Sequence, residues 1–266
     1  MNETEIITSV HNPRIRQLLQ LQQKSSERRK AGLFAVEGRR ELRHCIDAGF
    51  EIDTVFLSEE LGEGSDVFQF PNTNTQCLKV SPSLYERIAY RGSTEGVIAL
   101  VRSRSLHLSD LRVGKSPLIM VLESVEKPGN LGAVLRSADA AGVDAVIVCD
   151  PLTDLYNPNL VRSSIGAVFT VPCVACSSAE CIVWLKDKGI SILTAQLQDS
   201  KLYYDTAMTG PTAIVMGTEA TGLTEVWRQA ADAHIRIPML GRLDSLNVSV
   251  SAAILLYEAV RQRKTN

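Results

Sequence analysis

Polar side chains that could hold a charged ligand and orient a hydroxyl group occur in three loops of this sequence. Each loop follows a short apolar stretch of strand character. The side chains concerned are Glu219, Ser245 and Asn247 in the second and third loops, and Arg136 on the helix that follows the first loop. If they converge, these groups suit a site that handles a hydroxyl substrate and a charged cofactor. Each also has a structural interpretation, because short polar residues cap helices and a helical arginine commonly forms a surface ion pair.

The second half of the chain must position these loops, and its pattern predicts a parallel sheet. Short, β-branched, nearly all-apolar strands alternate with helices, as expected when both faces of a sheet are covered. The predicted strands are 118–122, 145–149, 171–174, 190–195, 212–216 and 234–237, and the predicted helices are 131–141, 159–168, 179–188 and 248–261. Ligands of such sheets bind beyond the carboxyl ends of the strands, where the three loops begin.

The first hundred residues show a second, smaller alternation of strands and helices, followed by a polar stretch. The predicted strands are 32–38, 52–57, 75–80 and 96–101, and the predicted helices are 12–30, 39–48 and 82–88. Alternating elements of this kind predict an α/β fold. We therefore predict a small N-terminal α/β domain over 1–102, a linker over 103–116 and a C-terminal α/β domain over 117–266.

The composition argues against several classes of protein. The net charge of −2 indicates no general affinity for nucleic acid, although residues 24–43 hold seven Lys/Arg against three Glu and could form a local basic face. No apolar run reaches the ~18 residues of a membrane span, and the N-terminus lacks the pattern of a signal peptide. Six scattered cysteines suit reduced thiols in the cytoplasm. Cys173 and Cys176 have metal-ligand spacing, but no second pair or nearby His accompanies them, so no metal site is expected.

The loop sequences also lack two common nucleotide-binding patterns. The loop 123–132 contains glycines before a helix, but neither Gly-x-Gly-x-x-Gly nor a terminal Gly-Lys-Ser/Thr is present. A nucleotide-binding oxidoreductase is therefore a poor match. The residues alone predict a two-domain α/β protein with a polar site and an undefined reaction.

Three motifs resemble those of the SpoU (TrmH-like) RNA 2′-O-ribose methyltransferases, within the SPOUT superfamily. They are Asn130-Leu-Gly-Ala-Val-Leu-Arg136, Gly217-Thr-Glu219-Ala-Thr-Gly222-Leu223 and Ile237-Pro-Met-Leu-Gly241-Arg-Leu-Asp-Ser245-Leu-Asn247-Val-Ser-Val. The stretch Tyr156-Asn-Pro-Asn-Leu-Val-Arg162 is also similar to the family. The match covers about residues 117–262, in the family's order and spacing. Residues 34–38 and the basic helix after them resemble, more loosely, the family's small RNA-binding domain.

The resemblance implies methyl transfer from S-adenosylmethionine to a ribose 2′-hydroxyl, without a metal. The C-terminal domain would contain a deep trefoil knot that binds the cofactor, and the active site would form across a homodimer. The implied cofactor-binding residues are Gly217, Thr218, Glu219, Ile237, Met239, Leu246 and Asn247. The implied catalytic residues are Arg136, Asn130, Glu219, Ser245 and Asn247. Arg136 would lie at the hydroxyl, as a base or as a cation that stabilises the alkoxide.

The implied substrate is a structured RNA, with ribosomal RNA favoured over transfer RNA. The predicted RNA contacts are Arg39, Arg40, Arg43 and Arg162, and Arg28 belongs to the same basic surface. Such contacts position sugar and phosphate without reading sequence. A non-catalytic RNA-binding protein on the same scaffold is the alternative. Loss of one of the four polar loop residues would favour it, and all four are present.

Overall fold

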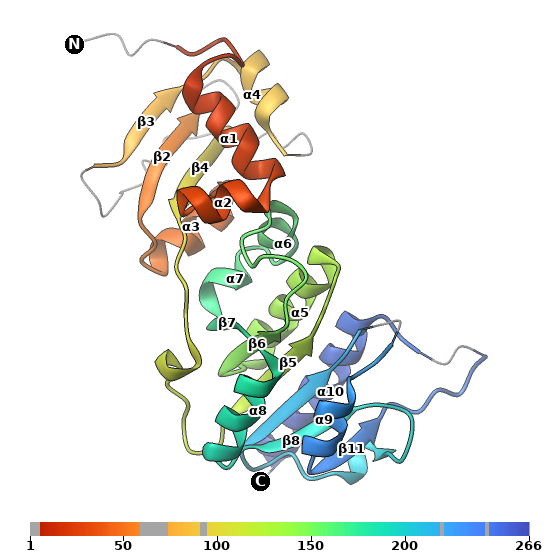
Figure 1. Cartoon of the computed structure of the whole chain (residues 1–266). Coiled ribbons are helices and arrows are strands. Elements are labelled where there is room, and N and C mark those ends of the chain that lie inside the picture. Colours follow the sequence, from red (N-terminus) through yellow and green to blue (C-terminus); the bar gives the residue numbers. More distant parts are fainter. Residues whose placement is uncertain (1–5, 59–73, 91–94, 219–220, 243–244, 266) are drawn as a thin grey trace. The chain divides into compact units, whose positions relative to one another are not determined.

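The chain folds into two compact units, each with its own β-sheet (Figure 1). This computed structural model describes residues 6–58, 74–90, 95–218, 221–242 and 245–265. The first unit comprises Met1–Arg104 and Asp154–Thr170, and the second comprises Ser105–Thr153 and Val171–Asn266. Both units combine helices with a sheet, so the predicted α/β fold class is confirmed. In the described ranges, no helix has the length and hydropathy needed to cross a membrane.

The first unit is built on a mixed four-stranded sheet. In spatial order its strands are β1 (Leu33–Glu37), β4 (Val97–Arg102), β2 (Ile52–Leu57) and β3 (Gln76–Lys79). Strand β4 runs antiparallel to β1 and β2, whereas β2 and β3 are parallel. The helices of this unit are α1 (Pro13–Gln23), α2 (Ser25–Ala31), α3 (Arg39–Asp47), α4 (Pro82–Ile88), α6 (Pro158–Ser163) and α7 (Ala167–Thr170). Apolar side chains of α1 and α4 pack on one face of the sheet.

The predicted helix over 12–30 is two helices, because the chain is extended at Lys24 (φ −119°, ψ 119°). Helix α1 begins where the Asn12 side chain accepts a hydrogen bond from the Arg14 amide at 2.9 Å, which satisfies one of the amides left open at a helix start. Helix α2 ends at Gly32, whose φ of 62° favours glycine. The predicted helix over 159–168 is also divided, by the left-handed residues Ile165 and Gly166.

Residues 154–170 belong to the first unit, although the predicted boundary placed them in the C-terminal domain. Tyr156 stacks on Phe34 with 4.1 Å between ring centroids, and Phe169 packs against Phe50 edge-on. These aromatic contacts join the segment to the face of the sheet opposite α1. The segment is brought back by tertiary contacts rather than by sequence proximity. The exact limits of the two domains stay a prediction.

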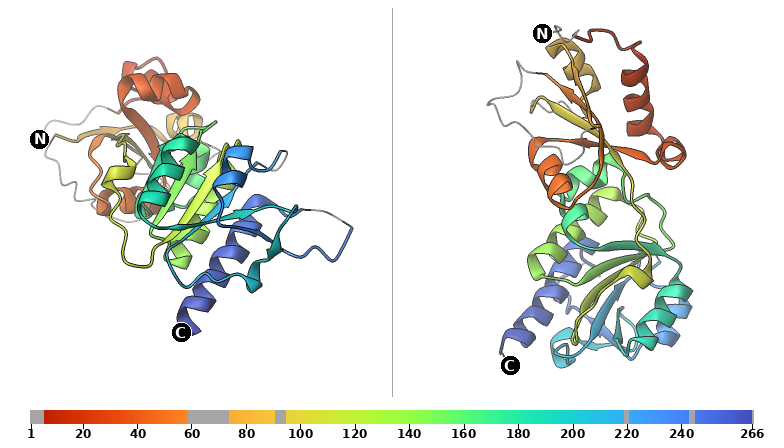
Figure 2. Two further views of the ribbon diagram at one scale, coloured as in Figure 1. Left: turned by 60° about the horizontal axis from the view of Figure 1, so that its bottom comes forward. Right: turned by 90° about the vertical axis from the view of Figure 1, so that its left-hand side faces the viewer.

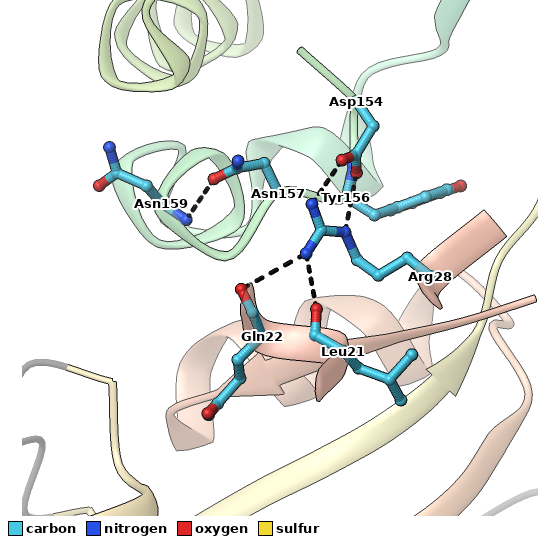
Figure 3. A network of polar contacts seen from close by, with 7 residues as sticks. All are labelled: Leu21, Gln22, Arg28, Asp154, Tyr156, Asn157 and Asn159. Carbon is cyan, nitrogen blue, oxygen red and sulfur yellow. Dashed lines mark hydrogen bonds and ion pairs between the residues drawn. The ribbon is translucent and has the colours of Figure 1, made fainter. Parts of the chain in front are cut away.

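A buried ion pair fixes the same segment (Figure 3). The Arg28 guanidinium donates to both carboxylate oxygens of Asp154, at 2.5 and 3.2 Å, and to the backbone oxygen of Leu21 at 2.6 Å. Arg28 is only 5 % exposed. The expectation that Arg28 forms part of an RNA-binding surface is therefore wrong, since its charge is used inside the unit.

The second unit contains a seven-stranded sheet in which every pairing is parallel, as predicted. In spatial order the strands are β7 (Cys173–Cys176), β6 (Ala145–Cys149), β5 (Leu118–Glu123), β10 (Thr212–Met216), β8 (Ser191–Ala195), β11 (Ala233–Arg236) and the unpredicted β9 (Lys201–Leu202). The helices are α5 (Pro128–Ala141), α8 (Ser178–Asp187), α9 (Glu225–Ala230) and α10 (Val248–Thr265), with short 3-10 turns η1 (Leu108–Asp110) and η2 (Tyr203–Asp205). Helices α5 and α10 cover one face and α8 and α9 the other (Figure 2). The trefoil knot stays a prediction.

Candidate active site

A cavity of about 390 Å³ lies at the carboxyl ends of three neighbouring strands of the second unit, β8, β10 and β11. We call it the loop cavity. The predicted site residues in its wall are Gly217, Thr218, Ile237, Met239, Ser245 and Leu246. The start of α10 contributes Val248 and Ser251 to the wall. The second and third polar loops therefore converge, as the parallel arrangement of strands predicted.

The loop after β10 is a tight turn that depends on glycine. The backbones of Thr218 and Gly222 exchange hydrogen bonds of 3.1 and 3.2 Å, and the Thr218 and Thr221 hydroxyls lie 2.8 Å apart. A Cβ atom at Gly217 would lie 2.2 Å from the backbone oxygen of Gly222. Only a residue without a side chain allows the chain to fold back so closely. Glu219, predicted to bind cofactor and assist catalysis, falls within this turn but outside the described residues.

Two asparagines join the first turn of α5 to the start of α10. The Asn247 side-chain nitrogen donates to the Asn130 side-chain oxygen at 3.2 Å. The Asn247 side-chain oxygen accepts from the amide and hydroxyl of Ser249, at 2.9 and 2.6 Å, and so caps α10. Asn247 thus has the helix-capping role considered from the sequence, and it also bonds to Asn130, which the sequence did not indicate. Asn130 lines a second cavity of about 120 Å³, which shares Gly217, Thr218 and Val248 with the loop cavity.

Arg136 does not join this group within one chain. Its side chain is exposed on α5 and is not among the residues lining the two adjoining cavities. The described arginines that line the loop cavity are instead Arg228 and Arg236. Arg236 donates to the backbone and hydroxyl oxygens of Ser200. The Nε atom of Arg228 is buried without a hydrogen-bond partner among the described residues.

A buried carboxylate that was not among the predicted site residues anchors the end of the loop after β10. Glu123 ends β5, is 3 % exposed, and accepts from the Thr224 hydroxyl at 2.6 Å and the Thr224 amide at 2.9 Å. Thr224 is the residue at which α9 begins. The Ser178 hydroxyl, 2.6 Å from Asp150, accepts from the Trp227 indole at 2.9 Å and extends the network. An acid at the end of an otherwise apolar strand was the available signal.

The cysteines that lie close together are not the pair with metal-ligand spacing in the sequence. Cys173 and Cys176 stand at opposite ends of β7, and only Cys176 belongs to a cluster. The sulfur atoms of Cys149, Cys176 and Cys181 all lie within 4.8 Å of one another. Hydrogen bonds from the other two thiols lower the pKa of Cys176, whereas hydrogen bonding to Cys176 and Cys181 and burial raise the pKa of Cys149. We call these three residues the thiol cluster.

The predicted RNA-contacting arginines lie in the first unit. Arg40 and Arg162 line a cavity of about 190 Å³ together with three glutamates, which include Glu41. Arg40 pairs with Glu41 at 3.1 Å, and Arg162 donates to the backbone oxygen of Tyr90 at 2.7 Å. Arg39 is half-buried and held by Glu95, whereas Arg43 is exposed. The sequence did not indicate that Arg162, about 120 residues further along the chain, would share a cavity with Arg40.

Comparison with known families gives matches in both halves of the chain. Residues 117–257 match the SpoU rRNA methylase family, and residues 12–99 match the MRM3-like substrate-binding domain. Among relatives, the 23S rRNA (uridine(2479)-2′-O)-methyltransferase of Streptomyces viridochromogenes is 31% identical, covering 97% of this chain and 92% of the relative. The 23S rRNA (guanosine(2553)-2′-O)-methyltransferase RlmP of Bacillus subtilis is 27% identical, covering 94% and 97%.

Solved structures are similar over nearly the whole chain. An RNA 2′-O ribose methyltransferase is 40% identical with a TM-score of 0.85, covering 98% of this chain and 100% of the other. The SpoU methyltransferase AviRb from Streptomyces viridochromogenes, in complex with the cofactor AdoMet, is 29% identical with a TM-score of 0.87, covering 96% and 99%. The similarity therefore includes both compact units.

Proposed function

The chain belongs to the SpoU rRNA methylase family and is an S-adenosylmethionine-dependent rRNA 2′-O-ribose methyltransferase, and we propose that its substrate is 23S ribosomal RNA. The observation that carries the proposal is the similarity over nearly the full chain, substrate-binding domain included, to relatives that modify 23S rRNA. The free cysteines agree with the predicted cytoplasmic location, which belongs to the same proposal.

The loop cavity fits S-adenosylmethionine, which supplies an activated methyl group when bound. Gly217 allows the turn that forms part of the wall to close, since a side chain there would meet the backbone of Gly222. The unpartnered Nε of Arg228 suits an acceptor atom of the ligand. We assign the holding of the cofactor to Gly217, Thr218, Ile237, Met239 and Leu246, whose backbone and side chains form the wall. Asn247 and Glu219, which lies outside the described residues, are assigned to the same group.

The ribose is positioned, in this proposal, by the polar residues at the edge of the loop cavity. Asn130, in the first turn of α5, and Asn247, which caps α10, bond to each other and so hold the starts of these two helices together. Ser245 in the wall adds a hydroxyl group. A 2′-hydroxyl is a weak nucleophile, so orientation and help with its proton must supply most of the acceleration. Arg136 provides this help, as a base or as a cation beside the developing alkoxide.

Arg136 reaches a loop cavity when two copies of the chain associate. It is exposed on α5, and α5 packs against α10, which exposes Val250 and Tyr257 by 47 % and 50 %. An apolar exposed face beside a required cation suits a symmetric dimer in which each copy completes the site of the other. The homodimer is therefore part of the proposed function.

Mapping of 2′-O-methyl groups in total RNA, from source cells with and without the protein, tests the substrate. We expect one mark in 23S rRNA to disappear and to return with the wild-type gene but not with an Arg136→Ala variant. Loss of a mark in transfer RNA alone would overturn the proposed substrate while leaving the reaction type intact.

Mixing two impaired variants, at an S-adenosylmethionine concentration too low to occupy Gly217→Ala, tests the shared site. Arg136→Ala and Gly217→Ala each lack one part, so random exchange should restore about a quarter of the wild-type activity, because half the dimers would contain one intact site of two. No recovery in a mixture shown to contain heterodimers would place the whole site in one chain. A monomer in light scattering, with full activity, would also contradict the dimer.

A further inference from the structure

The thiol cluster joins three elements of the second unit that the methyl transfer does not use. Cys149 ends β6 and Cys176 ends β7, and the two are opposite each other in the parallel pairing. Cys181 lies on α8, which covers these strands. All three sulfur atoms lie within 4.8 Å of one another, whereas the remaining cysteines do not join them. Convergence of thiols from two strands and a helix is the arrangement that a soft metal ion requires.

We infer that Cys149, Cys176 and Cys181 form a binding site for one thiophilic divalent cation of the zinc type. Zinc binds thiolates at about 2.3 Å, so tetrahedral ligands lie about 3.8 Å apart. The observed sulfur separations, at most 4.8 Å, need to contract by no more than about 1 Å. Rotation about the Cα–Cβ bonds can supply such a change without moving the strands.

The three side chains of the thiol cluster differ in burial. Cys149 and Cys181 are fully buried, whereas Cys176 is partly exposed. A cation can therefore reach the cluster on the Cys176 side. Three protein ligands with an open fourth position leave that position to a solvent molecule on the same side.

The charges around the cluster favour a cation. Asp150 and Glu180 carry negative charge beside Cys176. Three thiolates with a divalent cation have a net charge of −1, which the amino-terminal end of the ten-residue helix α8 offsets in part. Without a cation, three adjacent thiolates would repel one another, so metal binding replaces protons. The two acids are already engaged by hydroxyl and amide groups and serve as neighbouring charges rather than ligands.

Occupation of the site would fasten the carboxyl ends of β6 and β7 to α8. The Asp150 amide already donates to the backbone oxygen of Cys176 at 2.9 Å, and the Asp150 carboxylate holds the start of α8 through Ser178. A metal ion would add a covalent-strength connection between the same elements. Its role is structural, so it is independent of the proposed 23S rRNA substrate.

Titration of the reduced, metal-free full-length protein with Co²⁺ tests the site. We expect thiolate-to-cobalt charge-transfer absorption that saturates at one equivalent and disappears when Zn²⁺ is added. Cys176→Ser should lose this absorption, and the variant should keep its fold because Cys176 is only partly buried and serine is close to cysteine in size. Cys173→Ser is the matched control, because it changes the other end of the same strand outside the cluster.

Thermal unfolding with Zn²⁺ and with chelator provides a second measurement. The wild type and Cys173→Ser should unfold at a higher temperature with Zn²⁺, and Cys176→Ser should show no shift. Absence of Co²⁺ absorption in the folded wild type, or equal absorption in Cys176→Ser, would overturn the inference. Formation of a disulfide within the cluster under peroxide, without any metal binding, would assign these thiols to redox chemistry instead.

Discussion

The two compact units present their candidate binding surfaces in different ways. In the second unit, short loops at strand ends form the loop cavity from backbone atoms and small side chains, and buried Glu123 anchors the helix that follows one loop. In the first unit, long basic side chains on α3 and α6 lie at the surface, and Arg40 and Arg162 each have a partner within the unit. From this comparison we expect the proposed cofactor binding to depend on shape and the proposed RNA binding to depend on summed charge.

The largest effect is expected at Arg136, to which we assign a role in the chemical step. Arg136→Ala should lower methyl transfer by about 10²- to 10⁴-fold, the range for loss of a positioned proton-transfer group. Cofactor affinity, measured by calorimetry, should stay unchanged because we assign Arg136 to the ribose hydroxyl and the cofactor to the residues that line the loop cavity. Arg112→Ala, at another exposed arginine of the second unit, is the control and should retain full activity. Normal turnover in Arg136→Ala would remove it from the active site.

Loss of the buried ion pair of the first unit should lower stability much more than loss of an exposed ion pair. Arg28→Met leaves Asp154 without its cation and should lower the free energy of unfolding by about 3–5 kcal/mol. The exposed pair of Arg102 and Glu51, at 2.9 Å, offers a control, since Arg102→Met should cost no more than about 1 kcal/mol. Denaturant unfolding measures both. Equal losses in the two variants would contradict the assigned structural role of Arg28.

Gly217→Ala tests whether cofactor binding depends on the tight turn after β10. The added Cβ meets the backbone of Gly222, so the turn must open, and overpacking of this kind costs about 1–3 kcal/mol. If these ~1–3 kcal/mol destabilise the cofactor-bound conformation of the turn, the affinity for S-adenosylmethionine should drop by about 5- to 150-fold. Gly210→Ala has open space around the new atom and should bind normally. Unchanged affinity in Gly217→Ala would show that the turn is not part of the cofactor site.

Asn247→Ala distinguishes a helix cap from a site residue. Loss of the cap should lower stability by about 0.5–2 kcal/mol, and Asn12→Ala, which removes the same kind of cap from α1, should cost a similar amount. Only Asn247→Ala also breaks the bond to Asn130, so only this variant should lose methyl transfer. If both variants keep full turnover, Asn247 is merely a cap.

The smallest effects are expected at the basic surface of the first unit. Neutralisation of Arg40 and Arg43 with glutamine should weaken RNA binding several-fold, and the slope of log affinity against log salt should fall by about one for each phosphate that is no longer neutralised. Cofactor affinity should not change. Arg102→Gln, at a paired arginine of the same unit, serves as control. Identical RNA affinity at low salt in the double variant would refute the basic-surface hypothesis.

The sequence predicted much of the second unit because its strands and loops can be recognised from residues that are neighbours in the chain. Runs such as 118–122 and 212–216 are apolar and β-branched, and the polar residues directly after them mark the loops. Parallel strands then place these loops at one edge of the sheet. Residues 154–170 could not be assigned in the same way, because their contacts with Phe34 and Arg28 involve residues more than a hundred positions away.

The sequence by itself therefore determined the fold class, the three loops and the reaction type that their motifs imply. Only the tertiary structure decided that Arg28 is buried, that Arg136 lies away from the loop cavity of its own chain, and that Cys176 joins Cys149 and Cys181 rather than Cys173. The physical reason is that periodicity reports which face of an element is apolar. Which distant elements meet on that face depends on packing across the whole chain.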